Sequence, residues 1–156
     1  MCTVSTDQAR SVEATFALQK RTLTVSKAGN GSGLVTSGPA GIDCGSDCAA
    51  DFDLGSSVTL VPDPAPGSDF VGWSGACTGS GAACIVTIDQ ARSVQAEFSL
   101  EKRTLTVTKP GNGLGTVTSE PAGIVCGEDC TDEYDFGSSV TLTVTSSSGL
   151  RCAYTS

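Results

Sequence analysis

The sequence predicts an all-β protein of small domains in tandem, with little or no helix. Thr, Ser and Val recur at alternating positions along the 156 residues, and 19 glycines are spread between these runs. This pattern is typical of half-buried strands joined by turns. No segment keeps the apolar period of 3.6 residues that predicts an amphipathic helix. The third observation is an internal repeat, and it predicts the tandem arrangement.

The repeat has an offset of 82 residues. The segment KRTLTVSKAGNGSGLVTSGPAGIDCGSDC begins at Lys20 and returns at Lys102 as KRTLTVTKPGNGLGTVTSEPAGIVCGEDC. The segment CTVSTDQARSVEATFAL from Cys2 matches CIVTIDQARSVQAEFSL from Cys84 at the same offset. Each position in one unit therefore has a counterpart in the next.

We divide the chain accordingly into three parts. Residues 1–19 are the C-terminal strands of a truncated repeat, 20–101 are a complete repeat domain, and 102–156 are the N-terminal part of a further, truncated repeat. The similarity stops after Gly149, so the counterpart of Trp73 is lost.

Alternating apolar residues mark the strands of the complete repeat in order. The first strand holds Leu23 and Val25, and an Asn30-Gly31 turn predicts a hairpin back to the strand that Val35 opens and Pro39 ends. The later strands are expected around Val58 and Leu60 up to PDPAPG, around Phe70, Val71 and Trp73, around Cys84, Val86 and Ile88, and around Val94, Ala96 and Phe98. Phe52, Trp73 and Phe98 are the largest expected core residues.

Eight cysteines in a small acidic chain indicate an oxidising compartment. The C-x-x-x-C spacing is longer than a redox C-x-x-C motif, no helix follows it, and zinc would need four ligands in a chain without His. A compact turn can bring residues i and i+4 within disulfide range. The expected disulfide cysteines are Cys44 with Cys48, Cys77 with Cys84, and Cys126 with Cys130; Cys2 and Cys152 are unpaired or uncertain.

Acidic residues within and after the C-x-x-x-C turns are weak candidates for calcium, which prefers several oxygen ligands from a flexible loop. The spacing is not that of an EF-hand, and a solvated acidic loop is the commoner explanation. We therefore expect no metal and no other cofactor. The weak candidates are Asp47, Asp51, Asp53, Asp129, Glu133 and Asp135.

The composition disfavours several classes of function. A net charge of −8 disfavours binding to nucleic acid, and no apolar run is long enough for a membrane span. No His is available as a base, and GWSGA at 72–76 does not match a nucleophile elbow. We expect no enzyme and no catalytic residue. Trp73 could stack on a sugar if it were exposed, but a core position is expected.

The motifs LTVSKAGNGSGLVTS, GIDCGSDC, GSSVTL, DFVGWSGAC and IDQARSVQAEF together resemble the divergent internalin-B-type repeat of bacterial surface and secreted proteins. The resemblance covers the chain up to Gly149. It implies a β-grasp-like or related small β domain, repeated in tandem on extracellular proteins and without catalysis as a class. It also implies export by a signal upstream, since none is present in the printed sequence. No ligand-binding residue is implied.

These observations predict a non-enzymatic, disulfide-stapled spacer, stalk or adhesion-type repeat of an extracellular or cell-surface protein. Its partners would be neighbouring repeats of a longer parent protein. The alternative is a ligand-binding module for a surface glycan or a host protein, assisted by calcium. An exposed aromatic patch would favour that alternative, whereas a polar surface would favour the spacer.

Overall fold

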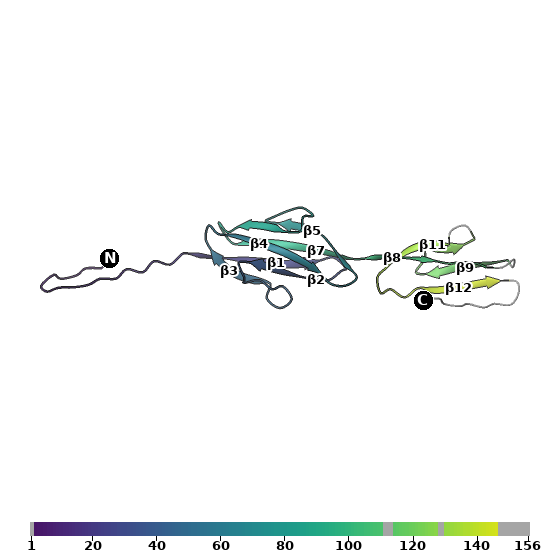
Figure 1. The fold of residues 1–156 in the computed structure, drawn as a ribbon, viewed down its shortest axis with the longest axis horizontal. Helices are drawn as coiled ribbons and strands as arrows, with labels where there is room; N and C mark the ends of the chain where they lie inside the picture. The colour runs from purple at the N-terminus through teal and green to yellow at the C-terminus, as the bar shows by residue number, and fades with distance from the viewer. Residues whose placement is uncertain (1, 111–113, 128–129, 147–156) are drawn as a thin grey trace.

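The structure, a computed structural model, describes residues 2–110, 114–127 and 130–146. In Figure 1 an extended N-terminal segment leads into a central body of strands, and a second body of strands follows. The all-β class predicted from the sequence is confirmed. The described residues contain no helix, and hence none that is long and apolar enough to cross a membrane.

The central body contains seven strands, and the second body contains five. The central strands are β1 (Lys20–Ala28), β2 (Gly33–Gly38), β3 (Ala49–Asp53), β4 (Ser57–Pro64), β5 (Ser68–Gly75), β6 (Cys84–Thr87) and β7 (Arg92–Leu100). The others are β8 (Lys102–Thr106), β9 (Gly115–Glu120), β10 (Val125–Cys126), β11 (Thr131–Asp135) and β12 (Thr141–Ser146).

The central body consists of two sheets, in the orders β3-β1-β7-β5 and β2-β4-β6. β1 and β7, the first and last strands, lie side by side and parallel in the larger sheet, with Val25 opposite Val94. The inward side chains of both sheets form one apolar core. Every pair other than β1 and β7 is antiparallel.

The large core residues expected from the sequence are confirmed. The exposed fraction is 7% for Phe52, 5% for Trp73 and 1% for Phe98. The Phe70 ring packs against both Trp73 and Phe98: its centroid lies 4.9 Å from that of Trp73 and 5.6 Å from that of Phe98. The run from Ser93 to Phe98 is a strand, as its alternation predicts.

The second body reproduces the first half of the central body, as the repeat predicts. β8 pairs with β11 as β1 pairs with β3, and β9 pairs with β12 as β2 pairs with β4. Local contacts return at the same offset. The Ile42 N–H donates to Ser37 Oγ at 2.9 Å, and the Ile124 N–H donates to Ser119 Oγ at 2.9 Å.

The hairpin predicted at Asn30-Gly31 is wrong. β1 and β2 do not pair, because they belong to different sheets. The segment between them crosses from one sheet to the other and is bound to β7. The Gly31 N–H donates to the Phe98 carbonyl at 3.0 Å, and Asn30 Oδ1 accepts from the Leu100 N–H at 3.1 Å. β3 and β7 occupy both edges of β1, which leaves no edge for β2.

One strand boundary and one whole strand also differ from the prediction. β4 does not stop before PDPAPG but continues through Pro62 to Pro64, opposite β2. β6 pairs with β4 only as far as Leu60, so beyond that residue one edge of β4 is free and a proline without an N–H is tolerated there. The strand β3 was not predicted, because only Phe52 within it is buried.

We predict that Phe98→Ala lowers the free energy of unfolding of the central body by about 3–5 kcal/mol, because it leaves a cavity between the two sheets. Denaturant titration followed by Trp73 fluorescence measures this, since Trp73 is the only tryptophan. The counterpart variant, Phe16→Ala, removes a ring that is 92% exposed and should change the value by less than about 0.5 kcal/mol. Equal effects would contradict the assigned core.

Candidate functional site: the junction between repeats

A single residue joins the two bodies. β7 ends at Leu100 and β8 begins at Lys102, so only Glu101 lies between the strands. Its backbone is held from both sides: the Glu101 N–H donates to the Gly67 carbonyl at 2.9 Å, and its carbonyl accepts from the Phe136 N–H at 2.8 Å. The connection is therefore a bonded joint rather than a free linker.

Side chains reinforce this joint. The Phe136 ring lies against Gly67, where a Cβ would overlap the ring and where φ is +78°, a value that favours glycine. The Arg103 guanidinium lies 5.6 Å from the centroid of the same ring, within the range of a cation–π contact. Arg103 also forms an ion pair with Glu101. The Phe136 ring thus packs between Gly67 of the central body and the Arg103 guanidinium of the second body.

An ion pair joins β8 to β11 at the start of the second body. Lys102 Nζ lies 2.6 Å from Asp135 Oδ1. The hydrogen bond from the ammonium to that carboxylate raises the pKa of Lys102, and the negative charge of Asp135 adds to the effect. Both groups are solvent-exposed, so the pair orients β8 against β11 more than it stabilises the fold.

The corresponding end of the central body has two of these contacts. The Leu54 N–H donates to the Gln19 carbonyl at 2.7 Å, as the Phe136 N–H does to the Glu101 carbonyl. Lys20 Nζ lies 3.1 Å from Asp53 Oδ1. The joint is therefore part of the repeat itself. Sequence reasoning missed it, although the DLGSS and DFGSS motifs at 53–57 and 135–139, each paired with an upstream Lys-Arg, could have indicated it.

The structure joins the six expected cysteines in neighbouring pairs. The Cα atoms are 4.2 Å apart in Cys44–Cys48 and in Cys126–Cys130, and 6.1 Å apart in Cys77–Cys84. Cys44 is fully buried, and its N–H donates to the Val35 carbonyl at 2.8 Å. The short disulfide therefore attaches an acidic turn to the core. Cys2 is free and exposed, and Cys152 lies outside the described residues.

The weak calcium candidates have protein partners or lie apart. Asp51 accepts from Thr22 Oγ1 at 2.7 Å, and Asp47 accepts from Ser46 Oγ at 3.2 Å. Asp53 and Asp135 form the ion pairs described above, Glu133 lies opposite Thr104, and Asp129 lies outside the described residues. In the described part of the chain, no three Cys, Asp or Glu side chains gather into a group that could hold a metal ion.

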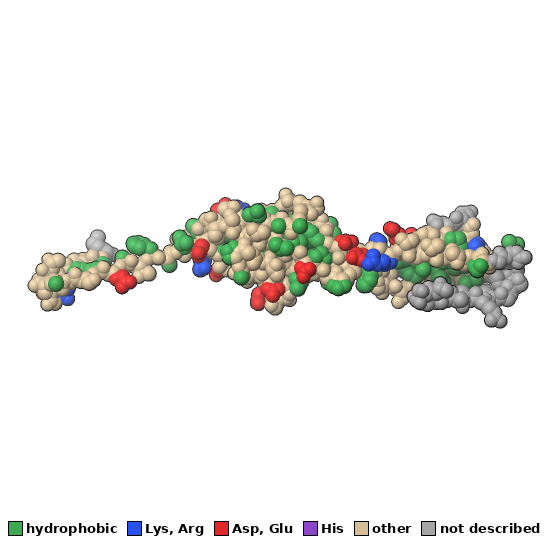
Figure 2. Space-filling model, in the orientation of Figure 1, with side chains coloured by type: hydrophobic (Ala, Val, Ile, Leu, Met, Phe, Trp, Pro, Cys, Tyr) green, Lys and Arg blue, Asp and Glu red, His purple; other side chains and the backbone are tan. Residues whose placement is uncertain are grey.

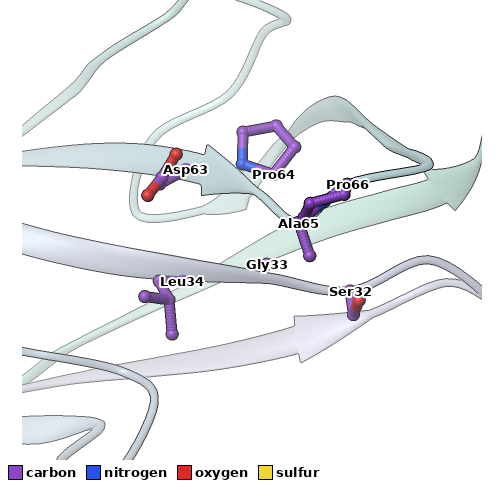
Figure 3. A pocket seen from close by; sticks show the side chains of 7 residues that line it. All are labelled: Ser32, Gly33, Leu34, Asp63, Pro64, Ala65 and Pro66. Atoms are coloured by element: carbon purple, nitrogen blue, oxygen red, sulfur yellow. The ribbon is translucent and has the colours of Figure 1, made fainter.

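One pocket of the central body has a volume of about 600 Å³ and lies where β2 begins and β4 ends. Figure 3 shows its lining, in which Asp63 is the only ionisable side chain and Ser32 the only hydroxyl. A single carboxylate with no second ionisable side chain among the lining residues is no catalytic constellation. Trp73 does not line it. The indole is buried, and its Nε1–H donates to the Gly81 carbonyl at 3.0 Å.

Fold and junction together define a class: a tandem array of small β repeats, each stapled by short disulfides and joined end to end by a bonded single-residue link. The family comparison agrees. The Divergent InlB B-repeat domain matches residues 21–102, more than half of the chain, and the chain belongs to this family. No curated protein and no solved structure matches the chain. The family resemblance inferred from the sequence motifs is confirmed.

We predict that replacing Cys44 and Cys48 together by Ala lowers the free energy of unfolding by about 2 kcal/mol, because the short loop regains entropy in the unfolded chain. Denaturant titration followed by Trp73 fluorescence is again the measurement. Cys2→Ser is the control and should leave the transition unchanged, since Cys2 is exposed and free. An unchanged free energy of unfolding in the double variant would contradict a stabilising role of the Cys44–Cys48 disulfide.

Proposed function

We propose that the chain is a non-enzymatic spacer or stalk module of an extracellular or cell-surface protein, in which residues 20–101 form one complete unit. The bonded joint at Glu101 carries this proposal. A spacer must hold what it carries at a set distance and direction, and a joint with hydrogen bonds from both bodies restricts rotation in a way that a Gly/Ser linker does not.

The repetition of the joint supports the same role. Because the Leu54 N–H donates to the Gln19 carbonyl as the Phe136 N–H donates to the Glu101 carbonyl, each unit provides the same acceptor for the strand that enters it. Units joined in this way add a constant increment of length, and the partners of a unit are its neighbouring repeats. The elongated arrangement in Figure 1 is consistent with such a stack.

The proposed location rests on the disulfides. Three of them in a chain of this size fit an oxidising environment outside the cytosol. The proposed lack of catalysis rests on the sequence without His and on the sparse pocket between β2 and β4. The burial of Trp73 removes the aromatic face that a glycan would need.

A second candidate is adhesion to a host protein through the outer face of the β2-β4-β6 sheet. Leu34, Val61 and Ile85, one on each strand, are between 43% and 67% exposed. Figure 2 shows apolar side chains on the surface of the central body. An aliphatic patch of this kind suits a protein partner better than a sugar.

We predict that Phe136→Ser or Gly67→Val makes the two bodies tumble independently. The first change removes the ring that lies against Gly67, and the second adds a side chain that would overlap that ring. ¹⁵N relaxation of the whole chain measures this as separate rotational correlation times for β1–β7 and β8–β12. Leu54→Ser is the matched control, since Leu54 is the counterpart of Phe136 but lies between β3 and β4, outside the joint at Glu101.

The wild-type chain should show a single correlation time for both bodies. Two different times in the wild type, or no change in either joint variant, would contradict the rigid spacer. Unchanged chemical shifts within β1–β7 would show that Phe136→Ser acts on the joint and not on the core.

A further inference from the structure

The N-terminal segment, residues 2–18, exposes side chains that its counterpart buries. Val4, Val12 and Phe16 are 40%, 63% and 92% exposed. At an offset of 82 residues their counterparts are Val86, Val94 and Phe98, with exposed fractions of 2%, 0% and 1%. The same apolar pattern therefore forms two core strands, β6 and β7, in the central body, whereas in residues 2–18 its side chains are exposed to solvent.

The second body has the complementary gap. In the central body β1 lies between β3 and β7, and β4 lies between β2 and β6. In the second body, within the described residues, β8 has only β11 beside it and β12 has only β9. Among the described residues no strand pairs with one edge of β8 and of β12, at the positions that β7 and β6 occupy in the complete unit. An open, flat strand edge can accept another strand.

The core beneath these open edges is incompletely covered. Leu23, Val58 and Leu60 of the complete unit are all fully buried. Leu105 and Val140, the counterparts of the first two, are half-buried, and Leu142, the counterpart of Leu60, is 37% exposed. The second body would bury these side chains if two strands with the sequence of β6 and β7 were added.

We propose that residues 2–18 of one chain add as strands to the second body of another copy, so that chains associate head to tail. Arg10–Leu18 would pair in parallel with the end of β8 and the residues that follow it, as β7 does with β1, with Val12 opposite Val107. Cys2–Ser5 would pair antiparallel with β12, with Val4 opposite Val140. The counterparts of β5 fall outside the described residues, so the proposal involves these two strands only.

The donor segment already has the turn that this pairing needs. Arg10 Nη2 lies 3.3 Å from Asp7 Oδ1, and in the complete unit Arg92 Nη2 lies 2.8 Å from Asp89 Oδ2 in the turn between β6 and β7. The segment and the second body lie at opposite ends of the central body in Figure 1, so a second copy, not the same chain, is the acceptor. Such a heterologous contact produces open filaments or rings.

The donor side is tested with Phe16→Asp in the full 156-residue chain, with Cys2 and Cys152 replaced by Ser so that thiols cannot link the copies. Sedimentation velocity over a range of concentrations measures association. We expect the parent chain to form concentration-dependent head-to-tail oligomers, and Phe16→Asp to weaken association by at least roughly tenfold. Val71→Asp, a similar change at an exposed residue of β5, should leave it unchanged.

The acceptor side is tested with Thr108→Pro. The Val107 N–H donates to the Cys130 carbonyl at 2.8 Å, so by alternation the Thr108 N–H, just beyond β8, faces the side on which the added strand would pair. Proline removes that donor and leaves the β8–β11 pairing in place, so it should also weaken association. Circular dichroism would confirm that the variant keeps its strands.

Four results would overturn the proposal. The parent chain could remain a monomer at its highest soluble concentration. Association could persist in Phe16→Asp, or weaken equally in Val71→Asp. Association could weaken in Phe16→Asp but not in Thr108→Pro, which would indicate apolar contact without strand pairing. The proposal does not depend on the spacer role, because the joint at Glu101 is altered in none of these variants.

Discussion

The parallel pairing of β1 with β7 is the constraint on which each repeat depends. It places the last strand of the unit in the middle of the larger sheet, where Val94, Ala96 and Phe98 cover the core. It also determines where the unit ends. Because β7 runs along β1 and leaves at the far end, the next unit begins there after a single residue, and the joint follows from the same geometry.

Much of the fold could be predicted from the sequence, because strand alternation and the repeat are local or periodic signals. The core positions of Trp73 and Phe98 follow from alternation alone. The hairpin at Asn30-Gly31 could not be judged in this way. An Asn-Gly turn is a strong local signal for a hairpin, but long-range pairing of β1 with β7 occupied the edge that the hairpin needed.

The candidate site was less predictable than the fold. The spacing of Cys44 and Cys48 was enough to indicate a short loop, since the geometry of such a pair is local. The joint was not visible in the same way. It requires a glycine carbonyl at Gly67, a backbone at Glu101 and a ring at Phe136, which are distant in sequence and meet only after both bodies have folded.

The β1–β7 pairing also has a consequence for how the protein is made. Ser26 Oγ and the Val94 carbonyl lie 3.5 Å apart but are 68 residues apart in sequence. A unit leaving a ribosome or crossing an export channel cannot close its larger sheet until nearly all of its residues have emerged. During that interval β1 presents an unpaired edge, and in a tandem array the last strand of a neighbouring repeat has almost the same sequence. Order of emergence, rather than sequence alone, therefore selects the correct partner strand.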